Sequence, residues 1–106
     1  MATYELRYFF EYGSGICLWS SNEAARIRFG YPVELDDLNL PPSVKDLAFE
    51  LMQRFDVSLD WDNPSEPSVW ARQDRDRFAA ESQTLLQRLS EHLGEDFRIK
   101  DERNLW

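Results

Sequence analysis

Residues that build most catalytic and metal sites are scarce in this sequence. Its 106 residues include a single cysteine, Cys17, and a single histidine, His92. One cysteine cannot form an internal disulfide, and one cysteine with one histidine cannot form the ligand cluster that holds zinc. We therefore expect no metal ion, no cofactor and no disulfide framework.

Long apolar runs are missing too. No stretch of the sequence approaches the ~20 apolar residues that a helix needs to cross a bilayer. Residues 1–5 also lack the basic and apolar regions of a signal peptide. These two absences predict a cytoplasmic protein.

Basic residues are few relative to acidic ones. The chain has 12 Lys and Arg against 20 Asp and Glu, which gives a formal net charge of −8. Such a surface repels phosphate backbones and anionic lipid headgroups, so we expect neither nucleic acid nor a membrane as partner. It attracts basic proteins instead and speeds the encounter with them.

Aromatic residues, in contrast, are plentiful. They make up 14% of the chain and include four Trp and seven Phe. Disordered segments are poor in such residues, so the chain is expected to fold. A length of 106 residues suits one hydrophobic core, and we expect a single domain over residues 1–106.

The N-terminal pattern predicts a β-hairpin. Apolar and polar residues alternate over residues 4–12, as in a strand with one buried face. Residues 13–15 are Gly-Ser-Gly, which suits a turn, and residues 16–20 resume the β pattern.

Helical patterns follow the hairpin. A short helix over residues 24–29 is expected to end at Gly30, and an acidic connector covers residues 34–41. Ser43 is expected to cap a second helix that ends near Val57. Its apolar stripe recurs at spacings of three and four, at Val44, Leu47, Ala48, Leu51, Phe55 and Leu59.

The C-terminal half predicts a loop, a long helix and a strand. Residues 60–67 hold two prolines and read as a loop, and a helix beginning at Ser68 or Trp70 should run to Leu93, before Gly94. Its stripe is Phe78, Ser82, Leu85, Leu89 and Leu93. Phe97 and Ile99 then alternate with basic residues, as in a last strand, whereas residues 101–106 carry no clear pattern.

This order of elements predicts an α+β fold. The expected architecture is a small, mostly antiparallel sheet, made of the N-terminal hairpin and the C-terminal strand, packed by two to three helices. We expect the hairpin face formed by Tyr4, Leu6, Tyr8 and Phe10 to pack under the two helical stripes.

Four local patterns could carry chemistry, and each has a simpler structural interpretation. Cys17 lies in a predicted strand, where a free cysteine packs as a small hydrophobic residue. His92 lies near a helix C-terminus, where an imidazolium interacts favourably with the helix dipole. The acidic segment 60–66 lacks the spacing of a calcium-binding EF-hand loop, and residues 13–15 have no lysine nearby to complete a phosphate loop. We therefore expect no enzymatic activity.

The negative charge is concentrated in the middle of the chain. Residues 31–70 hold nine acidic residues against two basic ones, a balance of −7. Large aromatic residues beside carboxylates suit a binding surface, because charge steers the encounter and aromatic side chains provide buried contacts. The alternative is that the tryptophans of this segment close the core while the acids around them are solvated.

We take the acidic segment as the candidate partner-binding surface. The candidate residues are Asp36, Asp37, Asp56, Asp60, Trp61, Asp62, Glu66 and Trp70, with the centre expected over residues 60–66. Prolines stiffen this region of the sequence, which reduces the entropy lost on binding.

Several segments together resemble a known class of small bacterial proteins. They are residues 8–20 (YFFEYGSGICLWS), 22–26 (NEAAR), 29–33 (FGYPV), 58–64 (SLDWDNP) and 67–70 (PSVW). The chain is similar over most of residues 4–94 to immunity proteins encoded beside bacterial polymorphic toxins of the Rhs, contact-dependent and type VI kinds. The resemblance implies a cytoplasmic protein that binds its cognate toxin domain and blocks it.

Three functions remain open from the sequence. The first is a toxin-neutralising immunity protein whose partner has a basic surface or cleft. The second is a small cytosolic regulatory or adaptor domain that binds another protein. The third is a small enzyme that uses carboxylates, which would need two convergent acidic groups in a cleft.

Overall fold

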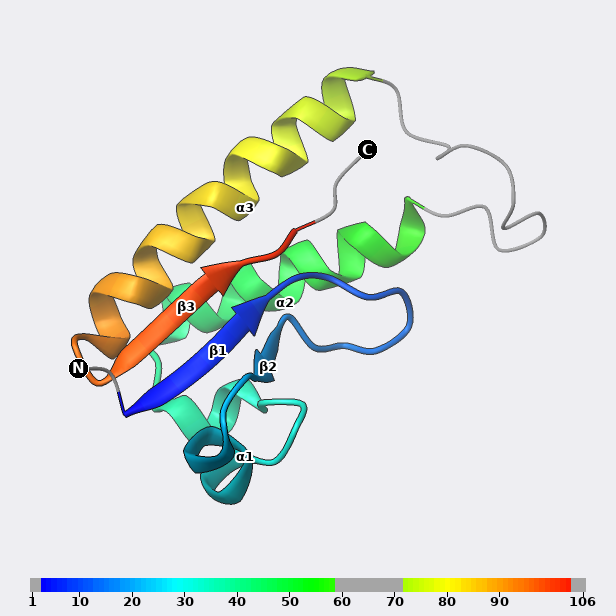
Figure 1. Ribbon diagram of the computed structural model, residues 1–106. Helices are drawn as coiled ribbons and strands as arrows, with labels where there is room; N and C mark the ends of the chain where they lie inside the picture. Colours follow the sequence, from blue (N-terminus) through cyan, green and yellow to red (C-terminus); the bar gives the residue numbers. More distant parts are fainter. Residues whose placement is uncertain (1–2, 59–71, 104–106) are drawn as a thin grey trace.

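The computed structural model describes residues 3–58 and 72–103, and the structural statements below refer to them. The elements in chain order are β1 (Tyr4–Tyr8), β2 (Leu18–Ser20), α1 (Glu23–Phe29), a 3₁₀-helix η1 (Leu35–Leu38), α2 (Pro42–Val57), α3 (Arg72–Leu93) and β3 (Phe97–Asp101). They confirm the α+β fold class (Figure 1).

The three strands form one mixed sheet in the order β2-β1-β3. β1 and β2 pair antiparallel, with Arg7 opposite Trp19, which confirms the predicted hairpin. Its strands are shorter than the patterns over residues 4–12 and 16–20 predicted. β1 and β3 pair parallel, with Leu6 opposite Ile99. A parallel pair needs a crossover connection, and all the helices lie between these two strands in the chain.

Local residues account for most helix boundaries. Asn22 caps α1, its side-chain oxygen accepting a hydrogen bond from the Ala25 amide at 3.0 Å, and Gly30 follows the helix with a φ of +83°. Only glycine adopts that backbone region without strain. α2 ends at Val57, as expected.

The predicted start of α2 was wrong by two residues. Pro41 occupies the N-cap position and Pro42 the first turn, so Ser43 lies inside the helix. Proline suits the first helical turn because its missing N–H would have no partner there. The predicted start of the long helix, at Ser68 or Trp70, lies outside the described residues, and so does Leu59, the last residue of the predicted α2 stripe.

The core lies between the sheet and the helices α2 and α3. Leu6 and Tyr8 of β1 are fully buried, and so are Leu51 of α2 and Leu85 of α3. The ring of Phe10 packs 5.5 Å from that of Phe55 and 5.2 Å from that of Phe78 between centroids. The expected packing of the hairpin face under both stripes is confirmed, with Tyr4, Phe10 and Leu47 partly buried at its margin.

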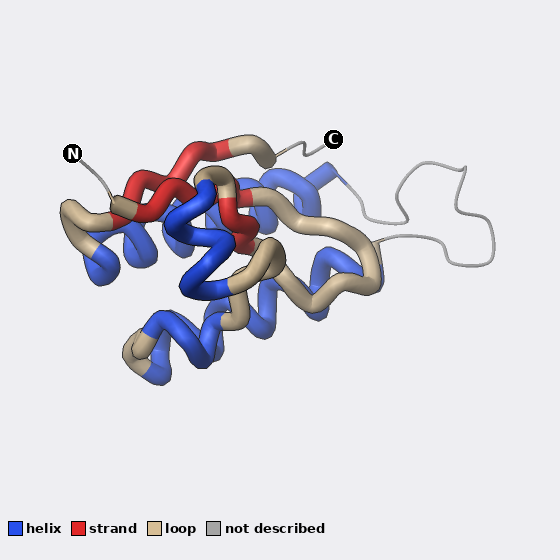
Figure 2. Tube along the Cα trace, turned by 60° about the horizontal axis from the view of Figure 1, so that its bottom comes forward, coloured by secondary structure: helices blue, strands red, loops and turns tan. Residues whose placement is uncertain are grey.

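Two views give the arrangement of the layers. In Figure 1 the strands lie in front of α2, and α3 runs beside β3. In Figure 2 the strands run along the top and α2 along the bottom. One face of the sheet therefore covers the core, and the side of α2 that faces away from the core lies opposite the exposed face of the sheet.

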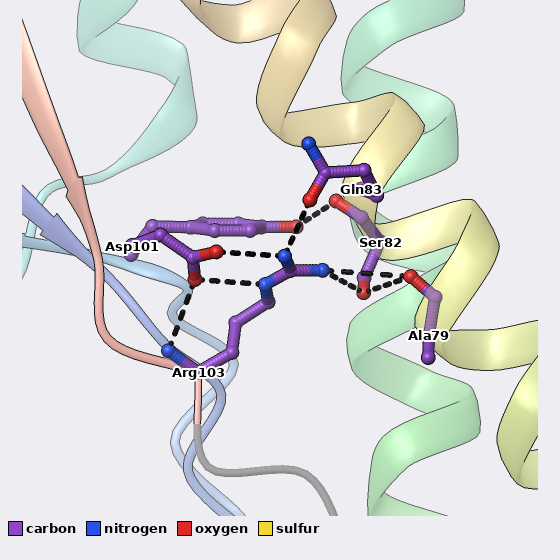
Figure 3. Close-up of polar contacts among 6 residues, drawn as sticks. Ala79, Ser82, Gln83, Asp101 and Arg103 are labelled. Atoms are coloured by element: carbon purple, nitrogen blue, oxygen red, sulfur yellow. Dashed lines mark hydrogen bonds and ion pairs between the residues drawn. The ribbon is translucent and has the colours of Figure 1, made fainter.

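Residues 101–103, for which the sequence predicted no pattern, hold β3 against α3. The Arg103 guanidinium donates hydrogen bonds to both carboxylate oxygens of Asp101, at 2.8 and 2.7 Å, and to the Ser82 hydroxyl at 2.7 Å (Figure 3). It also reaches the side-chain oxygen of Gln83. Hydrogen bonding from Arg103 lowers the pKa of Asp101 below its usual value.

We expect Arg103→Met to lower the free energy of unfolding by about 1–3 kcal/mol, the usual effect of losing hydrogen bonds to a charged group. The lowered pKa of Asp101 means that the ion pair adds stability at neutral pH and loses this effect as the pH falls below about 3.9. The difference in stability between the variant and the wild type should therefore become smaller in acid. Urea unfolding at pH 7 and pH 3 measures this, with the exposed Arg98→Met as control. Equal stabilities at pH 7 would contradict it.

Candidate partner-binding surface

Three of the candidate residues can be placed. Asp36 and Asp37 lie in η1, and Asp56 lies in the last turn of α2. The other candidates lie outside the described residues: Asp60, Trp61, Asp62, Glu66 and Trp70.

The two η1 carboxylates face different neighbours. Asp36 forms an ion pair with Lys45 in the first turns of α2. Asp37 lines a hollow of about 190 Å³ together with Arg28 and His92. The connector predicted over residues 34–41 is thus partly helical, and one of its carboxylates is neutralised by a neighbouring helix.

Asp56 has a structural role at the other end of α2. Its carboxylate accepts a hydrogen bond from the Gly13 amide at 2.9 Å, which ties the loop between β1 and β2 to the helix. Tyr12 in that loop stacks on Phe55, with 4.2 Å between ring centroids. Asp36 is held at Lys45, near the start of α2, and Asp56 lies near its end. Lys45 and Asp56 are eleven residues apart on the helix, so about 16 Å separates them. The placed candidates therefore do not converge on one point.

An exposed face of α2 runs between those two ends. We call the outer face of α2 the set of exposed residues spaced along one side of the helix: Asp46, Phe49, Glu50, Gln53 and Val57. Residues at spacings of three, four and seven share a helix face. Phe49 is 47% exposed and Val57 59% exposed, so two apolar side chains share this exposed face. The face therefore combines two apolar side chains with two carboxylates.

A groove borders the outer face of α2 where the helix approaches α3. It has a volume of about 330 Å³ and is lined by Glu50, Arg54, Val57, Asp74 and Arg77. Arg54 forms an ion pair with Glu81, and Arg77 donates to the same carboxylate at 3.2 Å. Hydrogen bonding from Arg54 is the main cause that lowers the pKa of Glu81, so this carboxylate stays ionised between two guanidinium groups.

The exposed face of the sheet is different, because its charges are mixed and partly paired. Arg7 of β1 forms an ion pair with Glu102 at 2.7 Å, and hydrogen bonding from Arg7 lowers the pKa of that carboxyl. Arg98 and Lys100 of β3 are exposed beside them. This face carries more basic than acidic side chains, in contrast to the outer face of α2.

The residues considered for catalysis have structural surroundings. Cys17 is buried, and desolvation raises the pKa of its thiol to about 12, so the expected packing role is confirmed. His92 lies in the last turn of α3, where its Nε2 is 3.1 Å from the Asn39 carbonyl oxygen. In the described part of the chain, no three His, Cys, Asp or Glu side chains gather as metal ligands would.

The comparison with known protein families identifies the chain. Residues 4–100, from the start of β1 almost to the end of β3, match the family described as Serratia CdiI immunity protein-like. The chain belongs to this family. The resemblance to immunity proteins is thereby confirmed. No curated protein matches the chain. Among the described residues of this immunity-family member, no helix is long and apolar enough to span a membrane.

The outer face of α2 is the feature that sequence reasoning missed. The described residues of the stripe that predicted α2 are all buried or partly buried. Phe49 and Val57 lie outside that stripe, on the polar side of the helix, where an apolar residue cannot reach the core. Their positions in the sequence could therefore have indicated an exposed apolar surface.

Proposed function

We propose that this immunity-family chain binds a cognate toxin domain in the cytoplasm and blocks it by stoichiometric protein–protein contact, with no chemistry of its own. The family match over residues 4–100 carries this proposal. The burial of Cys17 and the Asn39 contact of His92 agree with it, because a nucleophile needs an accessible, activated position.

The charge of the chain supports a basic partner. Residues 31–70 carry a balance of −7, and an acidic surface of this kind speeds the association of a basic protein. We propose that this segment supplies much of the toxin-binding surface, including Asp36, Asp37 and Asp56 in the described part of the chain. The candidates Asp60, Trp61, Asp62, Glu66 and Trp70 belong to the same proposal.

Titration against the toxin tests the proposed mechanism. The partner for this test is the cognate toxin domain, and an immunity gene is expected to follow its toxin gene directly. Inhibition should be complete at one equivalent, and light scattering should show a 1:1 complex. A stoichiometric inhibitor cannot protect beyond its own amount. Full inhibition at a hundredth of an equivalent would indicate an enzyme, and failure of the wild-type chain to bind or protect would contradict immunity altogether.

A further inference from the structure

Phe49 differs from every other phenylalanine of the chain. Each of the other six has an aromatic ring as neighbour, in pairs such as Phe9 with Trp19 or Phe29 with Tyr4. Phe49 makes no ring contact with any described residue and is 47% exposed in the middle of α2. Its environment on the free protein is therefore water on one side, although a large aromatic ring gains most from complete burial.

The charges around Phe49 are unbalanced. The two basic residues of segment 31–70 are both engaged within the protein, Lys45 with Asp36 and Arg54 with Glu81. Asp46 and Glu50 flank Phe49 on the outer face of α2 and form no ion pair with any part of the chain that the structure describes. Because Lys45 and Arg54 are paired with other carboxylates, the negative charges of Asp46 and Glu50 are not balanced by an ion pair.

We propose that the outer face of α2 is the toxin-docking surface, with Phe49 as its central apolar contact and a basic region of the toxin as its occupant. This inference rests on the proposed function. It places the centre of the toxin-binding surface on α2 instead of on segment 60–66. Buried aromatic side chains near the middle of an interface contribute most to affinity, and complementary charge around them sets orientation and association rate.

The bordering groove gives the docking surface a second element. Glu50 and Asp74 lie on its wall, while Arg54 and Arg77 are held by Glu81. A groove of about 330 Å³ has room for one long side chain. A lysine or arginine of the toxin can therefore lay its apolar stem along Val57 and place its charge beside Glu50.

The opposite side of the molecule suits this partner poorly. Arg98 and Lys100 stand exposed on the sheet, with Glu5 opposite Arg98, and Arg7 is paired with Glu102. A basic toxin would meet like charges there, which disfavours docking. The charge arrangement therefore selects the α2 side, away from the exposed sheet face (Figures 1 and 2).

Paired substitutions test the docking surface with the purified cognate toxin domain. We expect Phe49→Ala to raise Kd at least tenfold, chiefly through faster dissociation. Its matched control is Ile27→Ala on α1, because Ile27 is also apolar and is 78% exposed. Gln53→Arg places a like charge on the outer face of α2 and should also weaken binding at least tenfold. Its control, Gln87→Arg on an exposed position of α3, should leave Kd unchanged.

The outcomes separate the two proposals. All four positions are exposed, so the melting temperatures of the variants should stay close to that of the wild type. If the wild type binds and inhibits the toxin while Phe49→Ala and Gln53→Arg keep the wild-type Kd, the docking surface is wrong and the proposed function stands. If the wild-type chain does not bind the toxin domain, the proposed function fails and the docking surface fails with it.

Discussion

Leu51→Ala is expected to lower the free energy of unfolding by about 2–5 kcal/mol, the range for removing a leucine from a packed core. Leu51 is fully buried in α2 within the cluster that joins that helix to β1 and α3. Domains of this size have a total stability of about 5–15 kcal/mol. This single truncation should therefore remove a large part of the stability and lower the melting temperature markedly.

Two matched variants make this measurement specific. Leu51→Met keeps the side-chain volume and should cost less than about 1.5 kcal/mol. Gln53→Ala changes an exposed residue of the same helix and should have almost no effect. Chemical denaturation of the three variants gives the comparison. A melting curve for Leu51→Ala that overlays the wild-type curve would mean that α2 does not contribute this face to the core.

The regular elements were predictable because their periodicity has a direct physical cause. Alternation at Leu6 and Tyr8 marks a strand with one buried face, and the stripe through Leu51 and Phe55 marks a helix lying on it. The same applies to Phe78 in α3. Burial of apolar area is the main force that decides where these strands and helices form. It produces a periodic pattern of apolar residues that can be recognised in a single sequence.

Pairing partners and tail contacts leave no such pattern. The alternation at Phe97 and Ile99 predicts a strand, but either strand direction buries the same residues, so the parallel pairing with β1 could not be read from it. Arg103 donates hydrogen bonds to both Asp101 and Ser82. These two residues come close to each other only when α3 packs beside β3. Ser43 is a good capping residue, yet Pro41 and Pro42 begin the helix earlier.

The candidate surface was predictable in its charge and not in its geometry. Composition gave the acidic segment 31–70 directly. It could not show that Asp36 is paired with Lys45, or that Asp56 accepts a hydrogen bond from Gly13 across the loop. Both are contacts between separate elements. The exposure of Phe49 likewise depends on which helix faces are covered.

Neutralising Asp60, Asp62 and Glu66 together, as Asp60→Asn, Asp62→Asn and Glu66→Gln, is expected to slow association with the toxin about tenfold or more at low salt. The reason is the charge of residues 31–70, which these three substitutions change from −7 to −4. Association rates measured between low and high salt should show a flatter salt dependence for the variant than for the wild type, because steering between exposed charges is screened.

A second triple variant separates a local effect from total charge. Glu11, Glu91 and Glu95 are exposed acidic residues outside segment 31–70, and their change to Gln alters the net charge by the same amount. If segment 60–66 steers the encounter, this control should keep most of the wild-type association rate. Equal slowing by both triple variants would assign the effect to net charge alone. Unchanged rates and an unchanged salt slope in the Asp60, Asp62 and Glu66 variant would leave the segment as a connector, and steering would then rest on other acids such as Asp46 and Glu50.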